Sequence, residues 1–207
     1  MFAQFFTIGL LMLMSSMLPG PDFALVTKNT LLYSRRAGIY TSLGVGSAIL
    51  VHITYCMLGL ALVISQSIVA FNIIKYLGAT YLIYLGIMSL LTPQRGSIAN
   101  STTRETTTIA NLTAFRHGFL CNLLNPKATL FFLALFTVII KPGTPLIWEI
   151  VYAVEMFVII TCWFIGLAFL LSHPRVLSAL NKIEKYISKI VGVFLIGFGT
   201  VLAFVKQ

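Results

Sequence analysis

Two of the few charged residues in this chain lie directly beside prolines in the middle of long apolar stretches. Asp22 follows Pro19-Gly20-Pro21, and Lys127 follows Asn125-Pro126. A proline removes a backbone donor and clashes with the carbonyl four residues earlier, so it interrupts a helix. Proline also suits the first position of a new helix, where the backbone N–H groups have no partner in the helix. We therefore expect each charge in the first turn of a half-helix.

The two charges relate differently to the helix dipole. The positive end of the dipole stabilises the Asp22 carboxylate and disfavours the Lys127 ammonium, which therefore needs an anion nearby. That anion is either Asp22 or the carboxylate of a substrate. A zwitterionic amino acid would suit both charges, with its ammonium near Asp22 and its carboxylate near Lys127 and the half-helix amides. In the alternative interpretation, Asp22 and Lys127 bond each other and only lock the helices together.

Two asparagines flank the second break. Asn122 and Asn125 either complete a binding site or cap the second half-helix, and the sequence leaves both interpretations open. Cys121 immediately precedes Asn122, and the other two cysteines, Cys56 and Cys162, also lie in apolar stretches. An odd number of cysteines in such positions argues against a disulfide framework.

The composition indicates an integral membrane protein. Of the 207 residues, 58% are hydrophobic and 9% are charged, against about 25% charged residues in soluble domains. So few charges cannot build a polar shell, which excludes a large soluble catalytic domain. The long continuous apolar runs differ from the alternating strands of a membrane β-barrel. We interpret the net charge of +9 as the bias of cytoplasmic loops towards Lys and Arg, not as a nucleic-acid surface.

Six apolar segments are candidates for crossing a bilayer, which needs about 20 apolar residues per helix. The predicted fold class is an all-α membrane protein with six transmembrane helices. The first segment is interpreted as a retained helix, because no basic residue precedes it and no cleavage site for a signal peptide follows it. The predicted spans are Phe2–Val26, Gly38–Ile64, Val69–Leu91, Leu112–Ile140, Leu146–Leu171 and Ile187–Val205.

The predicted spans fall into two sets of three. A polar, Thr-rich linker over residues 92–114 separates a first repeat, residues 1–91, from a second, residues 115–207. Pro21 and Pro126, 105 positions apart, each open an apolar run after a break, so the first helix of each repeat is predicted to be broken. An odd number of spans per half requires inverted topology. Paired interruptions in an inverted repeat mark the central site of a transporter.

Two titratable residues lie at similar depth in the two repeats. Glu155 is about 13 Å into the fifth span at 1.5 Å per residue, and its equivalent position in the first repeat is two residues from His52. Such a pair could relay protons. A buried carboxylate without a role is costly, which favours a function for Glu155. For His52, a hydrogen bond to a neighbouring helix is an equally good interpretation.

Lys and Arg are concentrated on one side of the predicted spans. By the positive-inside rule this places the 92–114 linker in the cytoplasm and both termini outside. The cytoplasmic side carries Arg35, Arg36, Arg95, Arg104, Arg116, Arg175, Lys182, Lys185 and Lys189, and the opposite side carries Lys75, Lys141 and Lys206.

An ordered series of motifs along essentially the whole chain resembles the LysE-type amino-acid exporters, in particular their homoserine/threonine branch. The resemblance implies an amino-acid exporter of the bacterial inner membrane, driven by proton exchange, and it is compatible with a homodimer. The motifs are Pro19-Gly20-Pro21-Asp22, Ser34-Arg35-Arg36-x-Gly38, Gly44-x-Gly46, Leu58-Gly59, Tyr81-Leu82-x-x-x-Gly86, Phe115-Arg116-x-Gly118, Asn122, Asn125-Pro126-Lys127-Ala128, Phe131-Phe132 and Glu155.

The residues and the resemblance lead to one main hypothesis: export of a small amino acid, similar to threonine, homoserine or leucine, by proton antiport. No zinc, phosphate-loop or nucleophile–base motif is present, so neither enzymatic activity nor a metal or other cofactor is expected, and the expected partners are the small-molecule substrate and the lipid bilayer. The residues expected to bind substrate are Pro19, Gly20, Pro21, Asp22, Asn122, Asn125, Pro126 and Lys127, and those expected to carry protons are Glu155 and His52.

Two other hypotheses compete with this one. The first is a transmembrane thiol relay through Cys121, but no cysteine lies near the equivalent position, Ser16, to act as a resolving partner. The second is export of a different small solute.

Overall fold

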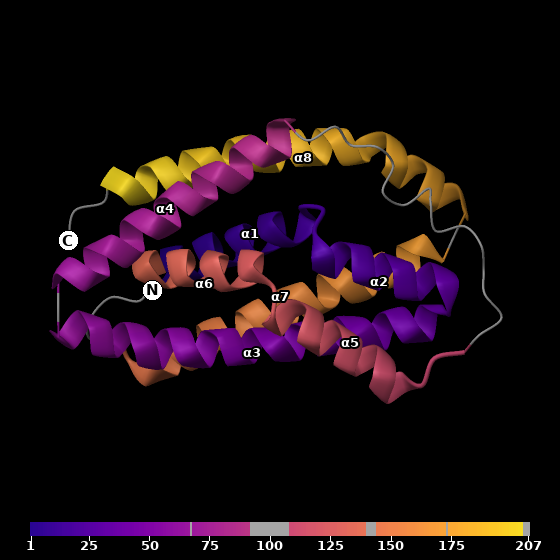
Figure 1. Cartoon of the computed structure of the whole chain (residues 1–207), viewed down its shortest axis with the longest axis horizontal. Coiled ribbons are helices and arrows are strands. Elements are labelled where there is room, and N and C mark those ends of the chain that lie inside the picture. Colours follow the sequence, from indigo (N-terminus) through magenta and orange to yellow (C-terminus); the bar gives the residue numbers. More distant parts are fainter. Residues whose placement is uncertain (67, 92–107, 140–143, 173, 205–207) are drawn as a thin grey trace.

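All the regular secondary structure in the described part of the chain is α-helical. The computed structural model describes residues 1–66, 68–91, 108–139, 144–172 and 174–204. Figure 1 shows the helices running roughly along the long axis of the molecule. They are α1 (Phe2–Met17), α2 (Pro21–Leu32), α3 (Arg35–Gln66), α4 (Ile68–Leu91), α5 (Asn111–Leu123), α6 (Pro126–Ile139), α7 (Leu146–Leu171) and α8 (Pro174–Phe204).

Both helix breaks predicted from the prolines are present. The axes of α1 and α2 are bent by 60° at the first break, and those of α5 and α6 by 58° at the second. Pro21 and Pro126 are the first residues of α2 and α6, positions where the missing N–H costs no helical hydrogen bond. The prolines thus end one half-helix and begin the next.

The helices fit a membrane protein. Within the described residues, Arg35–Gly59 of α3 and all of α7 are each long and apolar enough to cross a membrane. Each bent pair adds one further span if its two helices cross together, giving up to four. Lys75–Leu91 of α4 and Lys189–Val201 of α8 are apolar but shorter. The chain is therefore a helical membrane protein, while a count of six spans stays a prediction.

Helix ends differ from the predicted spans in three ways. The first predicted span ends at Val26, whereas α2 continues to Leu32. The helix α5 begins at Asn111, inside the predicted linker, whose residues 92–107 lie outside the described part of the chain. The helix α8 begins at Pro174, well before the predicted Ile187, because its first turns are less apolar than a span but still helical.

Glycines allow α3 and α5 to cross closely. A Cβ atom on Gly44 of α3 would lie 2.0 Å from the carbonyl oxygen of Phe115, and one on Gly118 of α5 would lie 2.0 Å from that of Thr41. Only glycine fits at either position. This crossing brings the end of α5, and therefore the second break, against the middle of α3.

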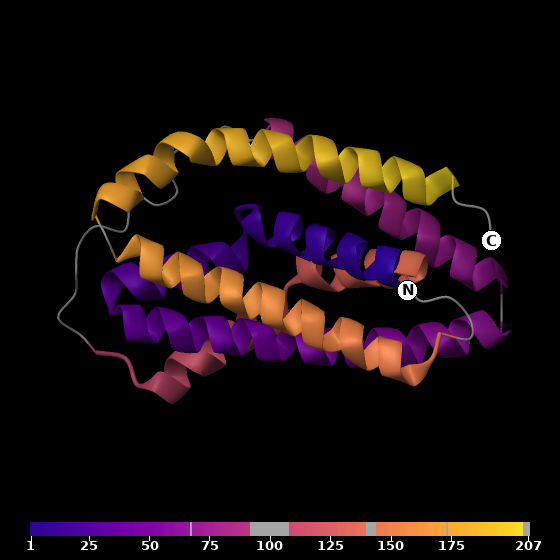
Figure 2. The same cartoon turned by 180° about the vertical axis from the view of Figure 1, so that it is seen from behind.

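The remaining helices pack in pairs. The helix α3 also packs against α7, and α4 packs along α8, as seen from both sides of the molecule (Figures 1 and 2). The apolar core has residues from α1, α2, α3, α4, α6, α7 and α8. Its most deeply buried large side chains include Ile8, Leu11, Met12, Ile49, Phe136, Tyr152 and Met156.

Candidate functional site

A pocket lies where the two helix breaks meet. It is bounded by the end of α1, the start of α2 and both sides of the second break, with α3 and α7 completing its wall. Its polar lining consists of Ser15, Ser16, Asp22, Asn122, Asn125 and Lys127, and its other lining residues are Met12, Leu18, Gly20, Pro21, Phe23, Val45, Ile49, Ala128, Phe131, Phe132, Ile160 and Phe164.

The structure brings most of the predicted binding residues to this one pocket. Gly20, Pro21 and Asp22 line it from the first break, and Asn122, Asn125 and Lys127 line it from the second. Pro19 and Pro126 are not part of the lining; they form the breaks that bring the other residues together.

The Asp22 carboxylate is held through only one of its oxygens. Oδ2 accepts hydrogen bonds from the side-chain Nδ2 atoms of Asn122 and Asn125, both at 3.0 Å. Oδ1 is buried and has no hydrogen-bond partner in the described part of the chain. A buried acceptor left without a partner costs about 1–3 kcal/mol, so this oxygen is available to a ligand that carries a donor.

Asn125 caps the second half-helix and also contacts Asp22 in the pocket lining. While its Nδ2 donates to Asp22, its Oδ1 accepts the backbone N–H of Lys127 at 3.0 Å and so caps the start of α6. Its carbonyl oxygen accepts the N–H of Thr129 at 3.1 Å, as a helix cap does. The oxygen of the Asn125 side-chain amide thus caps α6, while its nitrogen contacts Asp22.

Asn122 also carries an unused acceptor. Its Nδ2 donates to Asp22, whereas its side-chain Oδ1 is buried and has no hydrogen-bond partner among the described residues. The Oδ1 atoms of Asp22 and Asn122 are therefore two buried acceptors at one pocket.

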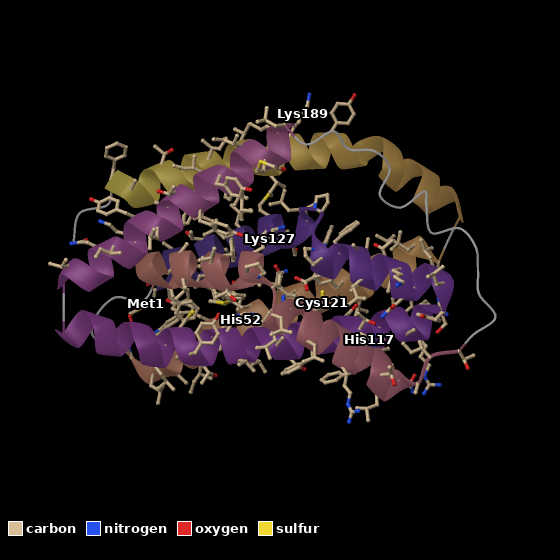
Figure 3. The ribbon with its side chains drawn as sticks, viewed as in Figure 1. Met1, His52, His117, Cys121, Lys127 and Lys189 are labelled. Carbon is tan, nitrogen blue, oxygen red and sulfur yellow. The ribbon has the colours of Figure 1, made fainter. Side chains whose placement is uncertain are left out.

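The Lys127 ammonium lies at the first break, in the interior of the molecule (Figure 3). A Cβ atom on Gly20 would lie 3.1 Å from its Nζ. Across the ranges that the structure describes, neither an ion pair with Asp22 nor a hydrogen bond holds this ammonium. The direct Asp22–Lys127 bond of the locking interpretation is therefore not formed, and the Asp22 carboxylate is bonded by two amides instead.

His52 forms the contact between helices that the sequence left open. Its ring is fully buried and stacks on Phe132 with ring centroids 5.3 Å apart. Its Nε2 donates to the carbonyl oxygen of Asn122 on α5 at 3.1 Å, and its Nδ1 is hydrogen-bonded to the Tyr55 hydroxyl. His52 does not line the pocket, but Asn122 connects it to Asp22.

Glu155 lies apart from His52. Its carboxylate faces α1, where a Cβ atom on Gly9 would lie 2.7 Å from Oε1, and its Oε2 is buried without a hydrogen-bond partner in the described chain. No hydrogen bond joins Glu155 to His52 within the described ranges. The two residues predicted to be equivalent thus have different surroundings.

Sequence reasoning missed two polar pocket residues, the apolar part of the lining and the contact between the breaks. Ser15 and Ser16 line the pocket from the last turn of α1; their position just before the break was the available signal. The three cysteines are free and lie on three helices, α3, α5 and α7. This arrangement lends no support to a thiol relay.

Two broken helices that meet at a pocket with a free carboxylate oxygen and a lysine define a helical membrane transport protein. Residues 13–205 match the family model described as LysE type translocator. The chain belongs to this family. It is therefore a transporter and not an enzyme, and a multi-pass protein of the bacterial inner membrane.

Similar proteins cover nearly the whole chain. The chain is 31% identical over 192 residues to YrhP, an uncharacterized membrane protein of Bacillus subtilis, covering 90% of this chain and 91% of the relative. It is 27% identical over 201 residues to a threonine efflux protein of Salmonella typhi, covering 96% and 97%. A threonine efflux protein of Escherichia coli K12 is 26% identical over the same length.

The family and these relatives support amino-acid export as the general activity. No solved structure matches the chain.

Proposed function

We propose that this protein exports a small neutral amino acid from the cytoplasm in exchange for protons. One observation carries the proposal: the pocket between the helix breaks contains an unpartnered oxygen of Asp22 and the Lys127 ammonium, which are not bonded to each other. These groups match the two charges of an amino acid. The threonine efflux relatives support the same substrate class.

The ammonium of the substrate would bind at Asp22 and Asn122. Both side chains line the pocket, and each has a buried oxygen without a partner in the described chain. An ammonium has three N–H donors, so it can donate to both oxygens at once. Its positive charge also compensates the Asp22 carboxylate, which its hydrogen bonds to the two neutral amides do not neutralise.

The carboxylate of the substrate would bind between Lys127 and the start of α2. The Lys127 ammonium lies against Gly20, the N-cap residue of α2. The N-terminus of a helix carries a partial positive charge and free N–H groups. Two positive groups that face the same location repel each other unless an anion lies there, and a carboxylate supplies that anion.

The charge balance favours a substrate with an uncharged side chain. Among the described residues that line the pocket, Asp22 is the only acidic and Lys127 the only basic one. In the proposed binding mode, the α-ammonium of the substrate pairs with Asp22 and its α-carboxylate with Lys127, so both charged side chains have a partner. A charged side chain would then be buried without a partner in a largely apolar pocket, which is strongly unfavourable.

The proposed architecture is two inverted repeats, residues 1–91 and 115–207, joined by a cytoplasmic linker. In chain order each bent pair is followed by two long helices, α3 and α4 in the first half and α7 and α8 in the second. This order supports six spans. Alternating access would come from one repeat rocking against the other around the pocket. A homodimer remains a prediction from the family resemblance.

Glu155 and His52 are the proposed proton carriers. The Glu155 carboxylate is buried between α7 and α1, one turn after Tyr152, whose hydroxyl is within hydrogen-bond distance of the carbonyl oxygen of Met1 and of Gln4 Oε1. His52 reaches the Asp22 carboxylate through Asn122. Intramembrane groups of this kind serve as proton relays in transporters.

The test is amino-acid efflux from bacteria preloaded with dipeptides that hydrolyse to single amino acids. Cells with and without the protein are compared, each with and without a protonophore. We expect faster excretion of one or a few neutral amino acids, lost when the proton gradient is collapsed. Efflux of all amino acids at the control rate, despite confirmed membrane expression, would contradict export. Faster efflux that a protonophore leaves unchanged would contradict proton coupling but not export.

A further inference from the structure

One hydroxyl in the pocket, that of Ser15, makes no hydrogen bond to the backbone of its own helix. Ser15 lines the pocket, and no hydrogen bond from its hydroxyl is found within the described residues. Helical Ser and Thr hydroxyls usually donate to a carbonyl of the preceding turn. Other hydroxyls in this chain do so, as for Ser16 to Leu13 at 2.7 Å and Ser42 to Gly38 at 2.8 Å.

Ser15 differs from its neighbour in what it can offer a ligand. Because the Ser16 hydroxyl already donates its proton to Leu13, Ser16 can only accept a further hydrogen bond. The Ser15 hydroxyl can both donate and accept. It is therefore the lining group best suited to bond another hydroxyl.

The other polar lining groups have partners in the proposed binding mode. Asp22, Asn122 and Lys127 bind the ammonium and carboxylate of the substrate, and Asn125 is committed to Asp22 and to the N–H of Lys127. The rest of the wall is mainly apolar, formed by side chains such as Val45, Ile49 and Phe164. Ser15 is thus left to meet the side chain of the substrate.

We propose that Ser15 is a specificity-determining residue, whose hydroxyl bonds a hydroxyl group on the side chain of the exported amino acid. This inference rests on the proposed function. An apolar side chain of the same shape would leave the Ser15 hydroxyl without a partner on the substrate, and sites built around a hydroxyl reject such analogues for this reason. The pocket therefore prefers a hydroxylated neutral amino acid to its apolar isostere.

Threonine and valine are the direct test, since they differ only by a hydroxyl in place of a methyl group. Efflux of each is measured from cells preloaded with the corresponding dipeptide, at matched internal concentrations and matched membrane levels of the protein. We expect the wild type to export threonine about 2- to 10-fold faster than valine, the range that one net hydrogen bond supports. Ser15→Ala should bring this ratio close to one.

Ser47→Ala is the matched control. It removes the same atom from α3, but the Ser47 hydroxyl donates to Leu43 at 2.8 Å and Ser47 does not line the pocket. We expect it to keep the wild-type ratio. Ser15→Thr, which retains a hydroxyl, should keep a preference for threonine, which separates loss of the hydroxyl from damage to the helix.

The other outcomes have distinct meanings. A wild-type ratio in Ser15→Ala, or an equal fall in the export of both amino acids, would overturn the role of Ser15 and leave the proposed function intact. A wild-type protein that exports both amino acids at one rate would do the same. A wild-type protein that exports neither, in cells where it is present in the membrane, would overturn the role of Ser15, and the efflux test over all amino acids would then decide the proposed function.

Discussion

Asn125 donates a hydrogen bond to Asp22 from one end of its side-chain amide and accepts the backbone N–H of Lys127 at the other, each at 3.0 Å. A single side chain thus fixes the Asp22 carboxylate relative to the start of α6. Because the link is an amide and not an ammonium, the charge of Asp22 is held in place without being neutralised. The second oxygen of Asp22 is left for another donor.

Replacing Asp22 with Asn should abolish export. The substitution removes the charge that faces the substrate ammonium and puts an amide N–H₂ near the amides of Asn122 and Asn125. Loss of one partner from a buried, hydrogen-bonded charge pair costs about 2–5 kcal/mol, so export should fall by at least about 30-fold. Initial efflux rates, with the membrane level of the protein checked by immunoblotting, provide the measurement. Export by Asp22→Asn at the wild-type rate would show that Asp22 does not bind the substrate.

Replacing Asn125 with Asp should destabilise the contact between the breaks. The new carboxylate can still accept the N–H of Lys127, but it has no N–H to donate and it repels Asp22. We expect the free energy of unfolding to fall by about 1–3 kcal/mol. This is measured as a lower midpoint of thermal unfolding in detergent.

A double variant in which the side chains at positions 22 and 125 are exchanged provides the control for this contact. In the double variant Asp22→Asn/Asn125→Asp, an amide at position 22 can donate to a carboxylate at position 125. We expect thermal stability to recover while export remains lost, because the charge has moved to the other break. Equal stability of the Asn125→Asp variant and the wild type would show that the bond to Asp22 contributes nothing to folding.

The crossing of α3 and α5 predicts a contrast between two glycines. A Cβ atom on Gly118 would lie 2.0 Å from the Thr41 carbonyl oxygen, whereas one on Gly166 meets nothing within 4 Å. Gly118→Ala should therefore destabilise the protein by about 1–3 kcal/mol or more. Gly166→Ala should be neutral or stabilise α7, since alanine favours a helix over glycine by up to about 1 kcal/mol. Thermal unfolding of the two variants in the same detergent compares them, and similar midpoints would contradict this crossing geometry.

Replacing Glu155 with Gln should uncouple export from the proton gradient. Glutamine keeps the size of the side chain against Gly9 but cannot carry a proton. Efflux down a substrate gradient should persist in Glu155→Gln, while an imposed proton gradient should no longer accelerate it. Proteoliposomes with an imposed pH difference measure both rates.

Glu149→Gln is the matched control for this experiment, since Glu149 lies in the first turn of the same helix, α7. It should respond to the gradient as the wild type does. A Glu155→Gln variant that still responds fully would exclude Glu155 as a proton carrier.

The sequence alone predicted the helical class and both breaks, because apolar length and proline position act locally. It could not predict that Asp22 is bonded to Asn122 and Asn125, since these residues are about 100 positions apart in the chain and only the packing of α2 against α5 joins them. Proline position likewise gave no information on which oxygen of Asp22 is left unbonded.

The prediction that His52 and Glu155 are equivalent residues of the two repeats was limited for a different reason. Alignment of the two halves compares depth along a helix and says nothing of the direction in which a side chain points around it. His52 points to the end of α5, whereas Glu155 points to Gly9 of α1. The start of α8 at Pro174 was missed because a helix of mixed polarity carries no span signal.

The two breaks differ in stiffness as joints. At the second break, Asn125 ties its side chain to the first turn of α6; at the first, the N-cap residue is Gly20, which has no side chain to make such a bond. Bending at Gly20 therefore breaks no side-chain cap bond, and glycine adds backbone freedom there. The main polar restraint on that hinge is the pair of bonds to Asp22. A ligand that draws Asp22 away from the two asparagines would thus loosen the softer of the two hinges.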